Sequence, residues 1–378
     1  MQLRVSLAAA AIITSMASQA EDYVSVQYLQ YDENENRTSV SAPSIMINKD
    51  FGTDYTLNAS FVVDVVSGAS KTYYMDSISG ASAFSRGEGS ASDVKYDNVE
   101  YSDQRAAGSV LFTTRFSNRD ELTIGGSRSS ESDFYSTEGS LEYMHWLGDS
   151  KNQSITLGAS YQFNEILDHC TGTDCSSGAS QRMDANALNI QASYSLNLNP
   201  TSYVKIAAFY SNDDGYLTNP YHNVVRNYEE GASAEVVNES RPDSKVAYGT
   251  SLKYASALTD AISLHLGYRY YTDDWEIDSH TIDSDVFYEL GNDWIFNLGL
   301  RYYMQSQAMF YNGAKDYFTD ETYASSDQRL SDFDAITYKA NVDYKIYEDL
   351  NINIGANFYD QSTGLSATYF VTGLTYKF

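Results

Sequence analysis

Polar side chains, some of them charged, occupy every second position in several segments whose other positions are apolar. Charges along the wall of a water-filled passage create a field that selects ions by sign. Ion pairs across such a passage can instead only hold its shape, and the sequence leaves both interpretations open. We predict that one common lumen is faced by Arg105, Arg115, Lys205, Lys253, Arg269, Arg301, Lys339, Lys345, Asp64, Glu142, Glu276, Asp278 and Asp343.

The signs of these charges support two opposite ion preferences. The basic majority on the predicted wall favours small anions in the lumen, whereas acidic loops favour cations at its mouth. The sequence does not say which effect dominates. The net charge of −27 repels phosphate backbones, so nucleic-acid binding is a poor interpretation.

Motifs that would carry catalysis are missing from the sequence. It has no Gly-rich phosphate loop and no HExxH or GxSxG signature. Of the five histidines, His265 and His280 fall on segments expected to be neighbouring strands, where they could form a polar lumen cluster with Glu276 and Asp278. A histidine that only satisfies the wall is the simpler interpretation. We therefore expect no enzymatic role, no catalytic residues and no cofactor.

Two sites could hold a metal, and neither is complete. The run Asn212-Asp213-Asp214-Gly215 resembles the start of a calcium loop but lacks the glutamate at its twelfth position. Glu229 and Glu230 could complete a divalent site only if the loop folds back, so a solvated acidic loop without a metal is the preferred interpretation. Cys170 and Cys175, together with His169, would leave a tetrahedral site one ligand short. A disulfide that closes one loop outside the cytoplasm is the preferred interpretation of the two cysteines.

The elements that must position these residues are strands. From residue 22 onward, runs of roughly ten alternating residues are joined alternately by short turns and by longer loops, which is typical of a membrane barrel. A soluble sandwich also alternates, so periodicity alone does not decide. The clearest apolar faces are Leu57, Ala59, Phe61, Val63 and Val65; Ile155, Leu157, Ala159, Tyr161 and Phe163; Ile262, Leu264, Leu266, Tyr268 and Tyr270; Trp294, Phe296, Leu298, Leu300 and Tyr302; and Leu350, Ile352, Ile354, Ala356 and Phe358.

The placement of turns and loops favours the membrane barrel. Short turns are expected at 50–54, 117–120, 148–152, 198–201, 259–260, 291–293 and 347–349, all on one side. Long connections, at 67–103, 168–182, 213–243 and 308–332, fall on the other side. We predict an all-β fold, a transmembrane antiparallel up-and-down β-barrel of about 16 strands with short periplasmic turns and long extracellular loops.

The two ends of the chain agree with export to an outer membrane. Residues 1–20 read as a signal peptide, with a basic start, an apolar run over 5–16 and small residues before a cleavage site after Ala20. Residues 21–378 then form the barrel domain. The final segment, 365–378, alternates up to a terminal Phe378, and we expect it to close the barrel against 23–31. The expected location is the outer membrane of a Gram-negative bacterium.

Aromatic content supports the same interpretation. The sequence has 34 Tyr and 16 Phe but only 4 Pro, a balance that suits a pleated surface exposed to lipid. Aromatic residues gather near the predicted strand ends, where amphipathic rings suit the membrane interfaces. Outer-membrane lipid, lipopolysaccharide and the barrel assembly machinery are the partners expected of such a chain.

Six ordered segments resemble motifs of the domain of unknown function 3570 (DUF3570) family. They are 66–70 (VSGAS), 130–136 (SESDFYS), 214–221 (DGYLTNPY), 239–243 (ESRPD), 301–306 (RYYMQS) and 326–331 (SDQRLS). The resemblance implies an outer-membrane barrel without established catalytic residues. It also implies a possible link to envelope redox chemistry, because genes of that family often neighbour those of a small lipoprotein, a thioredoxin-like protein and a flavin transferase.

Most of these segments lie in or beside the long loops and carry residues able to make charge-assisted hydrogen bonds. We expect the loops at 213–243 and 308–332 to fold over or into the mouth. Arg241 and Arg329 would lock them to acids. The candidate locking residues are Glu131, Asp133, Arg241, Asp243, Asp327 and Arg329.

The sequence as a whole predicts a pore or channel for small polar or ionic solutes. The alternative is a barrel scaffold that docks or sheathes a periplasmic redox partner, such as a flavin protein, a thioredoxin-like protein or a cytochrome. A third interpretation, an outer-membrane enzyme, would need a clustered acid, base and nucleophile, which the sequence does not offer.

Overall fold

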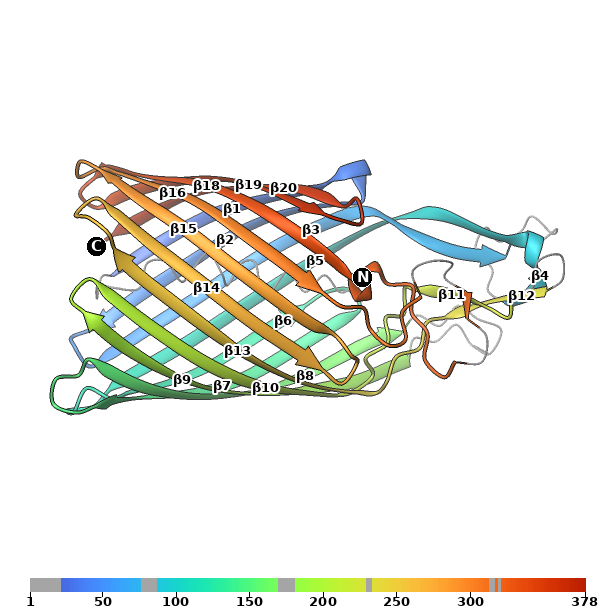
Figure 1. The fold of residues 1–378 in the computed structure, drawn as a ribbon, viewed down its shortest axis with the longest axis horizontal. Coiled ribbons are helices and arrows are strands. Elements are labelled where there is room, and N and C mark those ends of the chain that lie inside the picture. Colours follow the sequence, from blue (N-terminus) through green and yellow to red (C-terminus); the bar gives the residue numbers. More distant parts are fainter. Residues whose placement is uncertain (1–21, 76–86, 169–180, 229–232, 313–316, 319–320) are drawn as a thin grey trace.

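The computed structural model describes residues 22–75, 87–168, 181–228, 233–312, 317–318 and 321–378. Sixteen of the described strands form one closed antiparallel barrel in chain order (Figure 1). They are β1 (Tyr23–Glu33), β2 (Thr38–Phe51), β3 (Tyr55–Met75), β5 (Val94–Arg115), β6 (Glu121–Ser130), β7 (Phe134–Leu147), β8 (Gln153–Asp168), β9 (Gln181–Asn199), β10 (Ser202–Gly215), β13 (Ser244–Ala257), β14 (Ile262–Asp273), β15 (Asp278–Leu290), β16 (Trp294–Gln305), β18 (Phe333–Tyr347), β19 (Leu350–Gln361) and β20 (Ser366–Lys377). The predicted fold class is confirmed.

The barrel closes where its first and last strands pair. The register places Tyr23 opposite Lys377 and Tyr31 opposite Tyr369. This confirms the predicted pairing of 365–378 with 23–31. Closure leaves no unpaired sheet edge, which is the condition for strands to cross a bilayer.

The outward face of the wall is apolar and uncovered. Leu298 is 66% exposed, Phe163 is 60% exposed and Leu157 is 56% exposed, although each is a large apolar side chain. A soluble domain would bury such a continuous surface. Within the described residues, no helix has the length and apolar character needed to cross a membrane.

The seven predicted short turns all join strands at one end, which we call the short-turn end. One prediction at the opposite, long-loop end is wrong in extent. The connection expected over 67–103 is largely strand, because β3 and β5 stay paired out to Met75 and Val94. Alternation of polar and small residues in this segment hid the strand, since neither face of it is strongly apolar.

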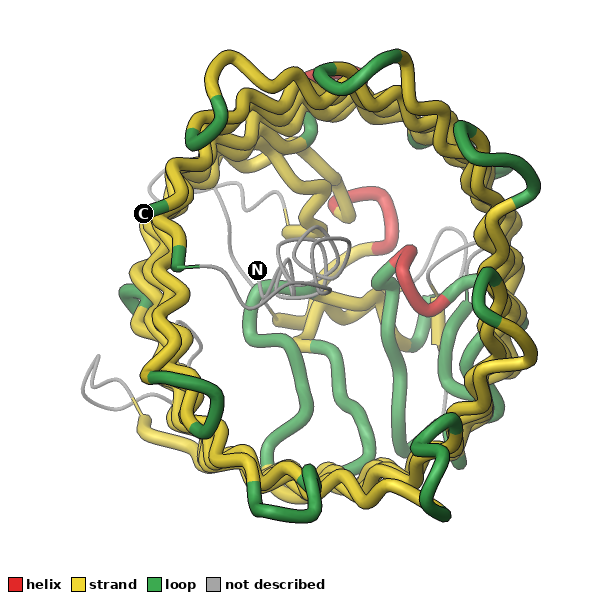
Figure 2. The backbone as a smooth tube through the Cα atoms, turned by 90° about the vertical axis from the view of Figure 1, so that its left-hand side faces the viewer, coloured by secondary structure: helices red, strands yellow, loops and turns green. Residues whose placement is uncertain are grey.

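A small second sheet lies beyond the long-loop end. It has the order β17 (Tyr317–Phe318), β11 (Asn223–Arg226), β12 (Ser233–Asn238) and β4 (Gly87–Ser90). We call this sheet, together with the described parts of 213–243 and 306–332, the cap. Figure 2, viewed from the short-turn end, shows cap segments crossing the outline of the lumen, and Figure 1 places them past the end of the strands. The cap therefore covers part of the mouth.

Candidate functional site

The lumen wall is the first part of the candidate site. In each strand, every second side chain points to the inner face of the barrel. The inward residues are those that pair across strands with other inward residues and alternate with the apolar outward ones. The inner face carries these predicted charges: Arg105, Arg115, Lys205, Lys253, Arg269, Arg301, Lys339, Lys345, Asp64, Glu142 and Asp343.

Several wall charges are paired with neighbours on the same wall. Arg105 lies 2.7 Å from Asp64, and both side chains are nearly buried. Arg115 lies 3.1 Å from Glu121 at the short-turn end. These pairs satisfy the charges locally, so they stabilise the wall and contribute little field to the lumen.

A four-charge group continues this pattern on β15, β16 and β18. Arg301 lies 2.7 Å from Asp283, and Lys339 lies 2.9 Å from Asp285 and 3.7 Å from Asp283. The prediction from the sequence did not include Asp283 and Asp285, because it assigned the wrong face of β15 to the lumen. The even-numbered apolar residues Val286, Tyr288 and Leu290 carry the signal that would have corrected it.

Four wall cations have no such partner among the described residues: Lys345, near the short-turn end of β18, and three that lie together on β10, β13 and β14. Lys205 and Lys253 stand directly opposite each other on β10 and β13, and in the described part of the chain no carboxylate pairs with either. Arg269, on neighbouring β14, is exposed and lies with its guanidinium 4.9 Å from the ring centre of Phe209. Like charges that face each other across a strand pair repel. The three cations, which we call the basic track, therefore need water or an anion for stabilisation.

Two further lumen acids lie on β7 and β18. Glu142 accepts a hydrogen bond of 3.0 Å from the side-chain amide of Gln191. Asp343 faces the lumen between Ile295 and Asn353. Neither lies on a strand that pairs directly with β10, β13 or β14.

Two predicted lumen acids lie elsewhere. Asp278 is opposite Thr272, on the outward face, and accepts a 2.8 Å hydrogen bond from outward-facing Tyr270. Glu276 lies in the turn before β15 with φ of 67°, so strand parity does not apply to it. The prediction extended alternation through this turn, whereas β14 ends at Asp273 and the four-residue connection resets the parity.

The same correction separates the two histidines. His265 faces the lumen opposite Asp285, whereas His280 faces outward opposite Tyr270. They lie on opposite sides of the wall and form no shared cluster with Glu276 or Asp278. The polar lumen cluster that these residues could have formed is therefore absent from this part of the described wall.

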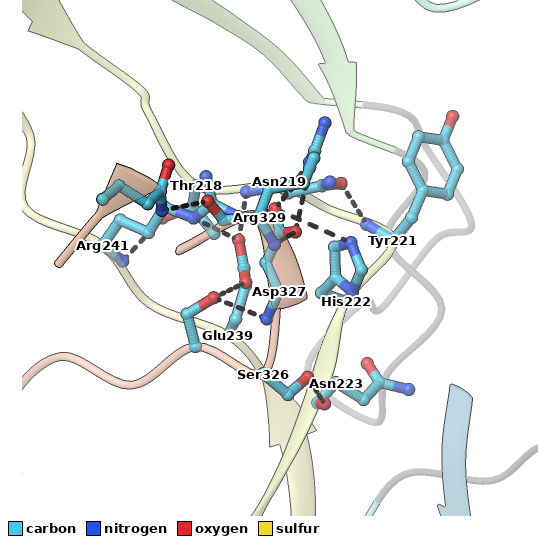
Figure 3. Close-up of polar contacts among 12 residues, drawn as sticks. Thr218, Asn219, Tyr221, His222, Asn223, Glu239, Arg241, Ser326, Asp327 and Arg329 are labelled. Atoms are coloured by element: carbon cyan, nitrogen blue, oxygen red, sulfur yellow. Dashed lines mark hydrogen bonds and ion pairs between the residues drawn. The ribbon is translucent and has the colours of Figure 1, made fainter. Parts of the chain in front are cut away.

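The second part of the candidate site is a buried ionic cluster in the cap (Figure 3). Arg241 lies 2.6 Å from Glu239 and 2.9 Å from Asp327, and Arg329 lies 2.5 Å from Asp327. The side chain of Glu239 is fully buried, and those of Arg241 and Asp327 are 10% and 5% exposed. Burial alone would raise the pKa of Asp327. The adjacent guanidinium of Arg329 outweighs this effect, so the pKa lies below its usual value. Asp327 is therefore ionised and holds both arginines.

Short hydrogen bonds complete the cluster. Glu239 accepts a 2.5 Å bond from the Ser325 hydroxyl and a 2.8 Å bond from the backbone N–H of Asn219. His222 lies 4.0 Å from Asp327, and burial lowers its pKa, which favours the neutral ring. Segments 214–221, 239–243 and 326–331, three of the six that carry the family resemblance, thus meet at one point.

The cap is attached to the wall as well as to itself. Gln305, at the end of β16, donates hydrogen bonds of 3.0 and 2.7 Å to the backbone carbonyls of Arg329 and Ser331. Arg37, between β1 and β2, donates a 2.9 Å bond to Gln328. An apolar cluster adds Trp275, Ile277, Ala308, Phe310 and Leu330. The cap is a packed unit fixed at several points of the rim.

The remaining candidate locking residues lie apart from this cluster. Asp243 is exposed at the start of β13, and its backbone carbonyl accepts from Gly215. Glu131 and Asp133 lie in the turn between β6 and β7, where their carboxylates and that of Asp103 are within 4.8 Å of one another. Burial raises the pKa of Glu131 to about 7; Arg105 opposes this rise and the neighbouring acids add to it. Cys170, Cys175 and the expected signal peptide lie outside the described residues.

Comparison with solved structures finds barrels of similar fold at low identity. CdiB from Acinetobacter baumannii matches with a TM-score of 0.53 and 8% identity, over 95% of this chain and 60% of that one. A bacterial polysaccharide outer membrane secretin matches with a TM-score of 0.49 and 7% identity, over 96% and 99%. A ferric enterobactin receptor from Pseudomonas aeruginosa matches with a TM-score of 0.47 and 10% identity, over 91% and 54%. The chain spans 54 to 60% of the first three matched chains.

Comparison by sequence gives one result. No curated protein matches the chain. The profile described as "Protein of unknown function (DUF3570)" matches residues 3–377.

Proposed function

Because the chain belongs to the DUF3570 family, whose description assigns no function, we propose one from the geometry: a channel for small polar or ionic solutes that prefers anions. The proposed location is the outer membrane of a Gram-negative bacterium, with the short-turn end in the periplasm and the cap outside. The apolar outward face then contacts membrane lipid and lipopolysaccharide. This orientation follows the usual asymmetry of turns and loops in such barrels.

Barrel size supports a passage. A barrel of sixteen strands is wider than one layer of side chains can fill, and barrels of 16 to 18 strands enclose an aqueous channel. Paired and unpaired charges on the inner face cost little beside water and much in a dry interior. A wall of this kind is suited to solute, not to a packed core.

The observation that carries the anion preference is the basic track. Lys205 and Lys253 face each other, and Arg269 lies one strand further on. Most other wall cations pair with neighbouring acids, as Arg301 does with Asp283 and Lys339 with Asp285, whereas Lys345 on β18 has no acid partner among the described residues. Three of the four uncompensated cations therefore lie together on one side of the lumen, where a passing anion gains most from them.

The cap is proposed to limit the size of the solute. Its ion pairs and its anchors to the rim hold it in place over part of the mouth, so a solute must pass beside it. The proposed role needs no catalytic group.

A planar-bilayer recording tests the proposal. Purified protein is expected to give single-channel steps in KCl, and a salt gradient is expected to give a reversal potential toward that of chloride. The Asp327→Asn variant removes the carboxylate shared by Arg241 and Arg329 and is expected to release the cap, so it provides a second barrel for the same recording. Absence of steps with both proteins, or a reversal potential toward that of potassium, would contradict the proposal.

A further inference from the structure

Tyrosines on the inner face repeat one local arrangement near the long-loop end. On four strands, a lumen-facing tyrosine hydroxyl donates to the side chain two residues further along, which shares its face. The pairs are Tyr31 to Glu33 at 2.9 Å, Tyr271 to Asp273 at 2.6 Å, Tyr303 to Gln305 at 2.7 Å and Tyr359 to Gln361 at 2.7 Å. All four strands run toward the cap, so each ring lies along the wall with its hydroxyl directed to the rim.

Small residues stand beside these rings. Across the strand pairs, Tyr303 faces Ala335, Tyr359 faces Ala367 and Tyr271 faces Gly249. The two alanines are buried, whereas each tyrosine is only half-buried. A large ring over a small neighbour covers the wall with one face and leaves the other accessible. The wall thus presents aromatic faces to the lumen beneath the cap.

Two strands add an arginine to the arrangement. β14 carries Arg269-Tyr-Tyr-Thr-Asp and β16 carries Arg301-Tyr-Tyr-Met-Gln, so a guanidinium precedes the lumen tyrosine by two residues on the same face. Arg301 is held by Asp283 at 2.7 Å. Arg269 has no carboxylate partner among the described residues and ends the basic track.

The rings around Arg269 form a platform. Phe209 and Tyr271 lie with ring centres 6.2 Å apart and planes at 28°, a stacked pair. Phe209 lies over Gly249, where an added Cβ would meet its ring at 2.2 Å, so this glycine makes room for the platform. Tyr271 is oriented by Asp273, which also accepts hydrogen bonds from the backbone N–H groups of Trp275 and Ile277 in the connection between β14 and β15.

We propose that Arg269, Tyr271 and Phe209 form a binding site for a carboxylate attached to a ring. The unpaired guanidinium takes the carboxylate through two parallel hydrogen bonds, and the aromatic platform takes the apolar face of the ring. Lys253 and Lys205 lead the anion along the same side of the lumen. The site rests on the proposed function only in that the solute enters the lumen.

Equilibrium dialysis against the purified barrel tests the site. The probes are benzoate, with an aromatic ring, glucuronate, with a sugar ring, and acetate, which has the carboxylate alone. We expect at least one ring-bearing probe to bind about tenfold more tightly than acetate, since a stacked ring contributes roughly that factor. The identity of that probe distinguishes an aromatic solute from a sugar acid. Equal binding of all three would overturn the inference.

Variants separate the two halves of the site. Arg269→Gln is expected to lower binding of every probe, and Tyr271→Leu to remove only the ring advantage. Tyr271→Phe keeps the ring and should bind as the unaltered protein does. Arg128→Gln, on the exposed outward face, is the charge-matched control. Retention of the ring advantage in both Tyr271→Leu and Phe209→Leu would overturn the assignment.

The outcome is independent of the conductance test. A barrel that conducts but binds the three probes equally retains the proposed function and loses this site. A barrel that gives no steps but loses benzoate or glucuronate on Arg269→Gln keeps the site and loses the channel. Heat-modifiable migration of each variant on a gel shows that the barrel is folded before binding is measured.

Discussion

The cap cluster and the basic track are both rich in charge, but the charges of the cap cluster are buried and paired, whereas those of the basic track are unpaired. In the cap, Arg241 is 10% exposed and lies between Glu239 and Asp327 at 2.6 and 2.9 Å. On the track, Lys205 and Lys253 face each other with no acid between them among the described residues. Buried charges must be paired, whereas charges beside water need not be. The paired cluster is therefore expected to hold structure, and the unpaired track to act on solute.

The largest effect is expected from removing the charge of Asp327, which lies between Arg241 and Arg329 in the cap cluster. Asp327→Asn leaves Arg241 and Arg329 without their shared carboxylate, and loss of one partner from a buried ion pair costs about 3 to 5 kcal/mol. We expect protease to cleave the cap rapidly while the barrel stays folded. Asp332→Asn, an exposed acid five residues away, is the matched control and should leave cleavage unchanged. Equal resistance of both variants would show that the cluster does not hold the cap.

The second test acts on the track. Replacing both Lys205 and Lys253 with glutamine removes two positive charges from the wall, and each contributes about 1 kcal/mol to an anion at close approach in water. If the two contributions add, the ratio of chloride to potassium permeability should fall by up to about thirtyfold. Reversal potentials in a KCl gradient measure this ratio. Arg128→Gln removes a cation from the outward face and should leave it unchanged.

A third test uses pH at the turn between β6 and β7. Burial raises the pKa of Glu131 to about 7, whereas the unfolded value is 4.5. The folded state therefore holds a proton that the unfolded state releases, and stability falls as pH rises through this window. We expect the free energy of unfolding to decrease by about 1 kcal/mol between pH 5 and pH 8, after allowance for solvent screening. Thermal melts at a series of pH values measure this change.

Glu131→Gln should flatten that pH profile. Its control is Glu35→Gln, an exposed acid in another turn at the same end of the barrel. A profile that is unchanged in Glu131→Gln would remove Glu131 as its origin.

The smallest expected effect is on barrel stability. Lys253→Met removes a repulsion across the strand pair with Lys205, which is worth roughly 0.2 to 1 kcal/mol. The apparent melting temperature should stay the same or rise slightly. A clear fall would mean that Lys253 has a stabilising partner and does not belong with the unpaired charges.

The fold was predictable because alternation is a local signal. In a strand with a fully apolar face, such as β16 with Leu298 and Leu300, a few residues are enough to predict which face points outward. Short turns fixed the direction of successive strands in the same local way. Where both faces are mixed, as at the far end of β3, the same reasoning placed the strand boundary too early.

The candidate site was predictable only in part. Arg241 and Arg329 were expected to meet acids, and their pairing with Asp327 depends on loops distant in sequence that alternation cannot place. Asp278 was assigned to the wrong face, because parity across a turn depends on the number of residues in it. The tyrosine arrangement was readable as Tyr-x-Glu, Tyr-x-Asp or Tyr-x-Gln before a turn, but its meaning needs the register that sets each ring beside a small residue.

One pair of recordings tests the central claim most directly, that the cap cluster holds structure and the basic track acts on solute. Single-channel current and reversal potential are measured in the same salt gradient for Asp327→Asn and for the double glutamine variant of Lys205 and Lys253. The account predicts that the first raises conductance and keeps the anion preference, while the second keeps conductance nearly constant and loses the preference. A reversal of these two effects, or a change of selectivity in Asp327→Asn alone, would contradict it.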